Sequence, residues 1–151
     1  FDGPRELNRF KKELSGFLSH TKSMSYGQGN PKVVLVSPTA IQSTPGVTSG
    51  KSQNRNLKLY TDAMGEVAKI NGVLFIDTYT PSTEWYKDGK AHSIDGALYN
   101  DHGYRKLATF LADSIFPNSK IDEKLLEHYK NAEHVSIIPL LKLIYIHNLC
   151  Y

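Results

Sequence analysis

The amino-acid sequence predicts an α/β fold built on a parallel sheet. Two short apolar runs, residues 33–36 and 73–76, have the composition of strands, being made of Val, Leu, Ile and Phe. Stretches with apolar residues at helical spacing stand before, between and after these runs. Alternation of helices and strands is typical of parallel strands joined by right-handed crossovers, with helices on both faces of the sheet.

The composition is that of one globular domain. Of the 151 residues, 40% are hydrophobic and 22% are charged, which excludes a disordered or fibrous chain. The net charge of +3 is spread along the chain, so a nucleic-acid surface, which needs a concentrated basic patch, is not expected. No apolar run reaches the roughly 18 to 20 residues that a membrane-spanning helix requires. The single cysteine, Cys150, excludes an internal disulfide and a multi-cysteine metal site.

The first helix is predicted to begin at Pro4, whose missing N–H would be unpaired in a first helical turn, with Gly3 before it as a cap. An apolar stripe at helical spacing then comprises Leu7, Phe10, Leu14, Phe17 and Leu18. Residues 19–31 are polar and contain two glycines and a proline, so a loop is expected there.

The first strand is predicted at residues 33–36, between Pro31 and Pro38. Its unbroken apolar character favours burial on both faces of a parallel sheet. A long loop rich in Ser, Thr, Gly and Gln follows over residues 37–53. Connections in α/β proteins usually have about two to six residues, and longer ones often carry function, so we expect this loop to contribute to a site.

The second helix is predicted from Asn54 to Asn71, with Gly72 after it. Both Asn and Gly tolerate the left-handed conformation that ends many helices. Residues 73–76 form the second predicted strand, also buried on both faces. Asp77, directly after this strand, is expected to be a structural hydrogen-bonding residue.

A second long loop is predicted over residues 78–100, at the same sheet edge as the first. It contains Trp85 and Tyr86, which either stack on a sugar or pack beneath the loop. The third helix then begins at Asn100, which can cap it, and ends at Pro117. In open α/β sheets ligands bind beyond the carboxyl ends of the strands, so the two loops define the expected site.

The sequence changes character after Pro117. Residues 1–118 are assigned to the α/β domain, and residues 119–151 to a C-terminal helix followed by an apolar tail. The helix has amphipathic spacing, whereas residues 135–151 follow no clean period. Whether this tail is native to the fold is left open.

Residues 95–108 resemble the last conserved block of the SGNH hydrolases, also called GDSL-type esterases and lipases. In that block, an Asp-x-x-His turn is followed by Asn, two variable residues, Gly-Tyr and a helix that contains Ala. The aspartate is matched by Asp95. The frame after it is matched by Asn100, Gly103, Tyr104 and Ala108. Residues 33–40, 56–68 and 73–77 are similar to the family's preceding strand, helix and strand.

The resemblance covers residues 1–116 and only the carboxyl-terminal portion of the family. It implies a three-layer α/β/α, flavodoxin-like fold, of which this chain would be a partial domain. The chain begins at Phe1 without a signal peptide, and we expect it to be a piece of a longer protein or a processed one. Analogy with the family favours an exported or periplasmic location, although the sequence itself does not identify the compartment.

The resemblance implies acyl transfer without a cofactor. In the family, a serine attacks an ester carbonyl, a histidine takes its proton, and an aspartate orients the histidine. Backbone N–H groups together with Gly and Asn residues stabilise the charge of the tetrahedral intermediate. The expected substrate is a small-molecule or glycan ester, and removal of acetyl groups from carbohydrates is the first candidate reaction. The oligomeric state does not follow from the sequence.

Two departures distinguish this chain from the family. The Gly-Asp-Ser block that carries the nucleophile and two further family blocks are absent, and they would belong upstream of Phe1. The histidine position of the Asp-x-x-His turn is occupied by Leu98, which cannot accept a proton. The 151 residues alone are therefore not expected to hydrolyse esters by the family mechanism.

Asp95 and His102 are the candidate catalytic residues. His102 lies in the first turn of the third predicted helix, where its loop faces the expected site, and His92 is the alternative base. A helix N-terminus disfavours the imidazolium form, and for each histidine an exposed polar role is the competing interpretation. Asp95, in turn, is in a position to cap an Asp-Gly turn. No metal site is expected, because the other four histidines show no ligand spacing.

Three functional interpretations stay open. In the first, the chain is part of an SGNH-type esterase or a degenerate member of that family. In the second, it is a non-catalytic module that binds a carbohydrate or a partner on the same scaffold, with Leu98 marking the lost base. In the third, the sequence is an incomplete or frame-altered reading of a gene, and the tail after Pro117 does not belong to the fold.

Overall fold

The computed structural model of the chain describes residues 3–25, 29–44 and 50–117. The predicted helix and apolar tail at residues 119–151 lie outside these residues. The contacts within the chain divide it into two units, Phe1–Leu111 and Ala112–Tyr151, and of the second unit only residues 112–117 are described.

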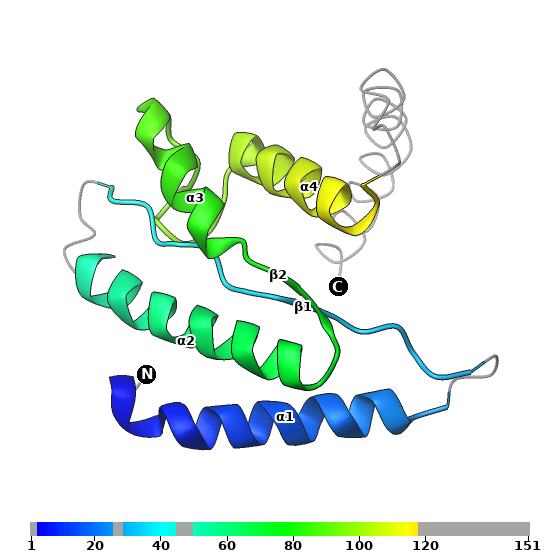
Figure 1. The fold of residues 1–151 in the computed structure, drawn as a ribbon. Coiled ribbons are helices and arrows are strands. Elements are labelled where there is room, and N and C mark those ends of the chain that lie inside the picture. The colour runs from blue at the N-terminus through cyan, green and yellow to red at the C-terminus, as the bar shows by residue number, and fades with distance from the viewer. Residues whose placement is uncertain (1–2, 26–28, 45–49, 118–151) are drawn as a thin grey trace, which may run out of the picture. The chain divides into compact units, whose positions relative to one another are not determined.

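The predicted alternation of helices and strands is confirmed, and the chain is a mixed α/β protein that is mostly helical (Figure 1). Its elements are η1 (Gly3–Glu6), α1 (Leu7–Ser23), β1 (Val34–Val36), α2 (Gly50–Ile70), β2 (Leu74–Ile76), α3 (Tyr79–Trp85), η2 (Tyr86–Asp88) and α4 (Asp101–Ile115). The two strands pair in parallel, with Val34 opposite Leu74 and Val36 opposite Ile76. Within the described residues they form a two-stranded sheet.

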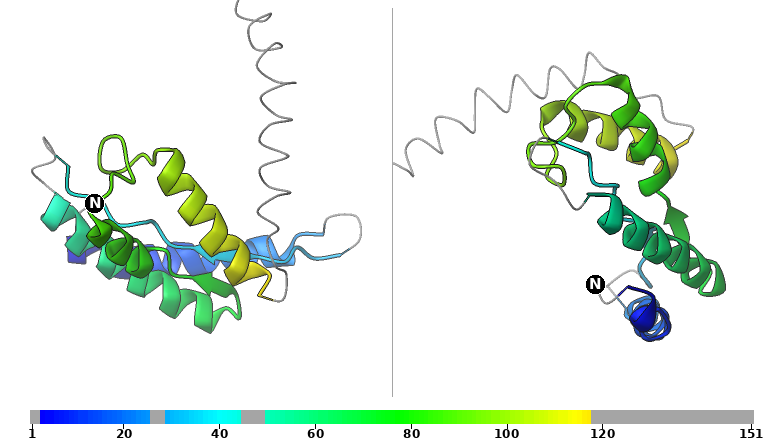
Figure 2. Two further views of the ribbon diagram at one scale, coloured as in Figure 1. Left: turned by 90° about the horizontal axis from the view of Figure 1, so that it is seen from above. Right: turned by 90° about the vertical axis from the view of Figure 1, so that its left-hand side faces the viewer.

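The first two long helices pack side by side, and α2 also packs against β2 (Figure 1 and Figure 2). Leu18 of α1 is buried, and the ring of Phe10 meets the ring of Tyr60 on α2 edge to face, with centroids 4.9 Å apart. The hydroxyl of Tyr60 donates to the carbonyl oxygen of Gly3 at 3.1 Å. Phe10 of the predicted apolar stripe therefore packs on α2 and Leu18 is buried, whereas Phe17 of the same stripe is 64% exposed.

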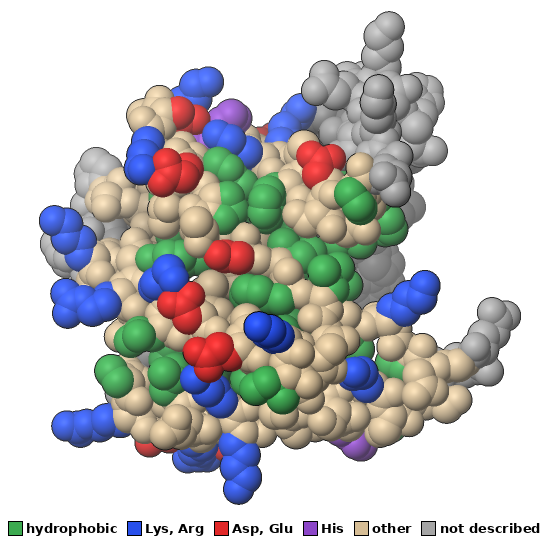
Figure 3. All heavy atoms as spheres, viewed as in Figure 1, with side chains coloured by type: hydrophobic (Ala, Val, Ile, Leu, Met, Phe, Trp, Pro, Cys, Tyr) green, Lys and Arg blue, Asp and Glu red, His purple; other side chains and the backbone are tan. Residues whose placement is uncertain are grey.

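The prediction that both strands are buried on both faces is wrong for the described part of the chain. Val34 is 36% exposed, Val36 is 38% exposed and Leu74 is 49% exposed. A parallel sheet buries its strands completely only when helices cover both faces, and α2 is the helix that packs against β2. Hydrophobic side chains accordingly reach the surface between charged side chains on the face drawn in Figure 3.

The second predicted loop also differs from the structure, because it contains the short helices α3 and η2. Asp77 accepts hydrogen bonds from the backbone N–H of Thr80 at 3.0 Å and from its hydroxyl at 2.6 Å, which confirms the structural role predicted for this residue. Pro81 lies in the first turn of α3, where proline removes no helical hydrogen bond. Local capping thus starts a helix that is too short to show a clear apolar period.

The carboxyl ends of the two strands are joined by buried hydroxyl groups. The hydroxyl oxygen of Ser37 accepts from the backbone N–H groups of Thr78 at 2.9 Å and Tyr79 at 3.2 Å. The hydroxyl of Thr78 donates to the carbonyl oxygen of Ser37 at 2.6 Å. Since Ser37 and Thr78 are both buried, these bonds hold together the two segments that leave the sheet.

Replacing Ser37 with alanine should destabilise the fold, because two backbone N–H groups would lose a buried acceptor. For Ser37→Ala we expect a loss of about 1–3 kcal/mol in the free energy of unfolding, measured by urea denaturation. The exposed hydroxyl of Ser23 at the end of α1 provides the control, and Ser23→Ala should change the free energy by about 0.5 kcal/mol or less. Equal effects of the two substitutions would contradict a structural role for the Ser37 hydroxyl.

Candidate functional site

The candidate site lies where the chain leaves the carboxyl ends of β1 and β2, as predicted for an open α/β sheet. Beyond the strands, the two segments stay hydrogen-bonded to each other. The backbone N–H of Ala40 donates to the hydroxyl oxygen of Ser82 at 2.8 Å, and that of Gln42 donates to the carbonyl oxygen of Gly96 at 2.8 Å. Side chains from both long segments are therefore held at one edge of the sheet.

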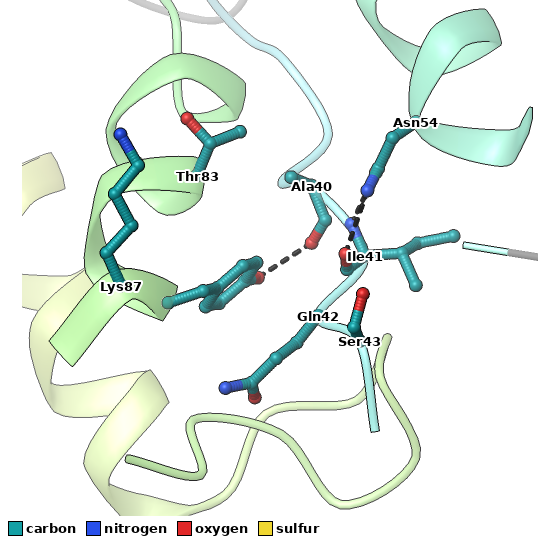
Figure 4. A pocket seen from close by; sticks show the side chains of 8 residues that line it. Ala40, Ile41, Gln42, Ser43, Asn54, Thr83 and Lys87 are labelled. Carbon is teal, nitrogen blue, oxygen red and sulfur yellow. Dashed lines mark hydrogen bonds between the residues drawn. The ribbon is translucent and has the colours of Figure 1, made fainter. Parts of the chain in front are cut away.

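A pocket of about 280 Å³ opens between the first long segment, α2 and α3 with η2 (Figure 4). It is lined by Ala40, Ile41, Gln42, Ser43, Asn54, Thr83, Tyr86 and Lys87. The side chain of Asn54 bonds both the N–H and the carbonyl of Ile41, and the hydroxyl of Tyr86 donates to the carbonyl oxygen of Ala40 at 2.7 Å. Neither Asp95 nor His102 lines this pocket.

The side chain of Gln42 holds the second long segment in place. Its Oε1 atom accepts from the backbone N–H of His92 at 2.9 Å, and from the backbone N–H and hydroxyl of Ser93 at 3.0 and 2.9 Å. Its Nε2 atom donates to the carbonyl oxygen of Lys90 at 2.8 Å. Nothing in the sequence around Gln42 signals this role, because its partners lie about fifty residues further along the chain.

Asp95 forms a tight turn with the three residues after it. Its Oδ1 atom accepts from the backbone N–H groups of Leu98 at 2.7 Å and Ala97 at 2.9 Å, and these bonds lower the pKa of the carboxyl group. Gly96 has a φ of 94°, a conformation that favours glycine. Leu98 is 51% exposed, and among the described residues no hydrogen bond joins Asp95 to a histidine. In the structure Asp95 thus caps an Asp-Gly turn.

The structure brings the two candidate histidines together. The rings of His92 and His102 have centroids 4.7 Å apart and planes tilted by 33°. His92 is completely buried, whereas His102 is exposed in the first turn of α4. A hydrogen bond of 2.9 Å links His92 Nε2 to Asp88 Oδ1, and His92 Nδ1 has no partner among the described residues. Asp88, and not Asp95, is therefore the carboxylate that orients a histidine.

Asp88 is held in its ionised form. Its carboxylate accepts from the backbone N–H of Lys90 at 2.9 Å, contacts His92, and lies 3.4 Å from Lys106 Nζ. The N–H of Lys90 makes the largest contribution to a pKa well below the usual range, followed by the hydrogen bond to His92. Asp88 ends η2 and His92 lies in the irregular segment after it, so their spacing of four residues gave no helical signal for the pair.

The start of α4 is fastened to the backbone of His92. Asn100 Oδ1 accepts from the backbone N–H of Gly103 at 3.0 Å, which confirms the predicted capping role. The backbone N–H of Asn100 donates to the carbonyl oxygen of His92 at 3.0 Å. Gly103 is buried, and a Cβ atom at that position would lie 2.1 Å from the His92 carbonyl oxygen. The Asn-x-x-Gly frame therefore has a physical reason: a cap, followed by a close approach of two backbones.

The sequence matches no protein-family model, and it matches no curated protein. Within the described residues, every helix is too short or too polar to cross a lipid bilayer.

Substituting Gly103 with alanine should disrupt the start of α4, because the added methyl group would lie 2.1 Å from the backbone carbonyl oxygen of His92 and 2.9 Å from the ring of Tyr99. We expect Gly103→Ala to lower the free energy of unfolding by about 1–3 kcal/mol or more. Gly16 is the matched control, since it lies in α1 and a Cβ atom there has no neighbour within 4 Å. Gly16→Ala should stabilise the protein by up to about 1 kcal/mol, and loss of stability in both variants would show that the close approach at Gly103 is not decisive.

Proposed function

We propose that the chain is the carboxyl-terminal portion of an SGNH-type ester hydrolase scaffold, in which this chain's own residues do not complete the acyl-transfer machinery. The observation that carries this proposal is the turn at Asp95. One carboxylate oxygen accepts the backbone N–H of residue 98, so the turn keeps the carboxylate beside the position at which the family has its histidine. In this chain that position holds Leu98, which has no proton acceptor.

Two further features support a partial three-layer α/β/α domain. The parallel β1–α2–β2 unit has the order of elements that the resemblance implies, with long segments at its carboxyl edge. Val34, Val36 and Leu74 expose apolar surface that neighbouring strands and a second helical layer would cover in a complete domain of this type. The Asn100 cap and the close approach at Gly103 give the family's Asn-x-x-Gly frame a structural purpose.

The chemistry of such a scaffold is hydrolysis of a small-molecule or glycan ester. A serine hydroxyl bonds to the ester carbonyl carbon, its proton passes to a histidine, and the alcohol leaves with that proton. Water then attacks the acyl-serine, which releases the acid and restores the serine hydroxyl. An aspartate such as Asp95 holds the imidazole in the required orientation and stabilises its charged form. Because Leu98 replaces the imidazole, the 151 residues are expected to turn over no p-nitrophenyl acetate by this route.

A non-catalytic binding module is the second candidate, and the pocket favours it. Its lining includes the hydroxyls of Ser43 and Thr83, which suit a ligand rich in hydroxyl groups, whereas the amides of Gln42 and Asn54 are engaged by the backbone of the fold. Trp85 does not stand free as a sugar platform, since its ring packs edge to face against Phe110 at 5.8 Å. Chemical shift changes confined to the pocket on addition of acetylated xylo-oligosaccharide, without turnover, would favour binding over catalysis.

Introducing histidine at position 98 tests the geometry of the turn. In Leu98→His, the carboxylate of Asp95 should stabilise the imidazolium and raise the pKa of the new imidazole by about one unit above its ordinary value of about 6.5. NMR titration of the ring protons measures this pKa. A raised pKa in the folded state also stabilises the variant at pH values below the pKa of the same group in the unfolded chain. This gain in stability disappears as the pH rises through the raised pKa.

The double variant Leu98→His with Asp95→Asn is the matched control, because asparagine keeps a side-chain oxygen for the turn but carries no charge. Its imidazole should titrate close to about 6.5. The same pKa in both variants would mean that Asp95 does not act on position 98, and the proposed ancestry of the turn would fail. Turnover of p-nitrophenyl acetate by the unaltered chain would show that other residues supply the chemistry.

A further inference from the structure

We propose that Asp88, His92 and His102 bind a divalent transition-metal ion of the Zn²⁺ class. One possible ligand atom of each residue lies within 4.8 Å of the other two. The three residues come from η2, from the segment that follows it, and from the first turn of α4. This site uses neither Asp95 nor Leu98, so it does not depend on the proposed function.

The distances suit a four-coordinate ion after a small adjustment. Zn²⁺ binds nitrogen and oxygen at about 2.0–2.2 Å, which places the ligand atoms of a tetrahedral site about 3.4 Å apart. Asp88 Oδ1 and His92 Nε2 are 2.9 Å apart, and the largest separation in the group is no more than 4.8 Å. His102 is exposed, so rotation of its side chain can bring its ring nitrogen the remaining distance of about 1.4 Å.

The carboxylate and the buried imidazole already face each other. Asp88 Oδ1 accepts from the backbone N–H of Lys90 at 2.9 Å and lies 2.9 Å from His92 Nε2. His102 stands in the first turn of α4, and its ring centroid lies 4.7 Å from that of His92. His92 is fully buried and its Nδ1 atom has no partner in the described part of the chain, so Nδ1 can carry the ring proton when Nε2 binds the ion.

The surrounding contacts hold the ligands in position. Gln42 fixes the backbone of His92 from one side, and the N–H of Asn100 binds the His92 carbonyl oxygen from the other. Gly103 lets α4 approach that carbonyl closely, so the first turn of α4 lies directly against the backbone of His92. Two imidazoles and one carboxylate are the ligand set typical of Zn²⁺ sites that keep a fourth position for water.

One cation competes for the same carboxylate. Lys106 Nζ lies 3.4 Å from Asp88 Oδ2 and also lies over the Trp85 ring, 5.9 Å from its centroid. A bound ion would be repelled by this ammonium group, which can retain its aromatic partner when the contact with Asp88 is lost. Removing the charge with Lys106→Met should therefore tighten metal binding.

Calorimetric titration of the full chain with ZnCl₂ measures its affinity for Zn²⁺. The visible absorption bands of bound Co²⁺ report whether the site is four-coordinate. His102→Ala and Asp88→Asn should each weaken Zn²⁺ binding about tenfold or more. Even residues that only hydrogen-bond to metal ligands contribute about 10–100-fold to the affinity for the metal. His102 and Asp88 are exposed, so these variants should fold, which a ¹H–¹⁵N correlation spectrum checks.

Controls separate this site from the other histidines of the chain. His20 is exposed on α1, and His20→Ala should leave the tightest binding event unchanged. Joint replacement of His128, His134, His147 and Cys150 should likewise remove only weaker events. The proposal is overturned if His102→Ala binds Zn²⁺ as tightly as the unaltered chain, or if His20→Ala or the joint replacement weakens binding as much as His102→Ala does.

Discussion

The buried amide of Gln42 is the contact on which the candidate site depends. Its oxygen accepts from three donors on His92 and Ser93, and its nitrogen donates to the carbonyl of Lys90. A buried amide left without partners costs several times what one exposed hydrogen bond contributes, so the segment cannot move away without a large penalty. In the part of the chain that the structure describes the sheet has two strands, and buried side chains such as this one hold the long segments that follow them.

The hydrogen bonds of Gln42 position two different groups of residues. The segment fixed by Gln42 carries His92 to the start of α4, and it continues into the turn of Asp95. The turn carries the resemblance to SGNH hydrolases, whereas Asp88, His92 and His102 carry the metal proposal. Because the two groups share a support but no residue, the failure of one proposal leaves the other intact.

The exposed faces of the strands show how strongly burial depends on neighbouring elements. Val34 and Leu74 are opposite each other in a parallel pair, and both expose more than a third of their surface. Residues of this type in a parallel sheet usually lie under helices on both sides. An apolar surface of this kind is a place where further elements of a three-layer domain would pack, in keeping with the proposal of a partial scaffold.

The sequence by itself determined the order of the long helices and the strands from local periodicity, and the cap at Asn100 from a side chain that bonds to nearby backbone. The alternation of these elements in turn predicted the parallel pairing of the strands. It did not reveal the short helix α3, whose seven residues are too few for a period. Tertiary structure alone decided the exposure of the strands, the pairing of Asp88 with His92 and the approach of His102. These features depend on contacts between elements, and on Gly103 allowing two backbones to meet, which no local pattern encodes.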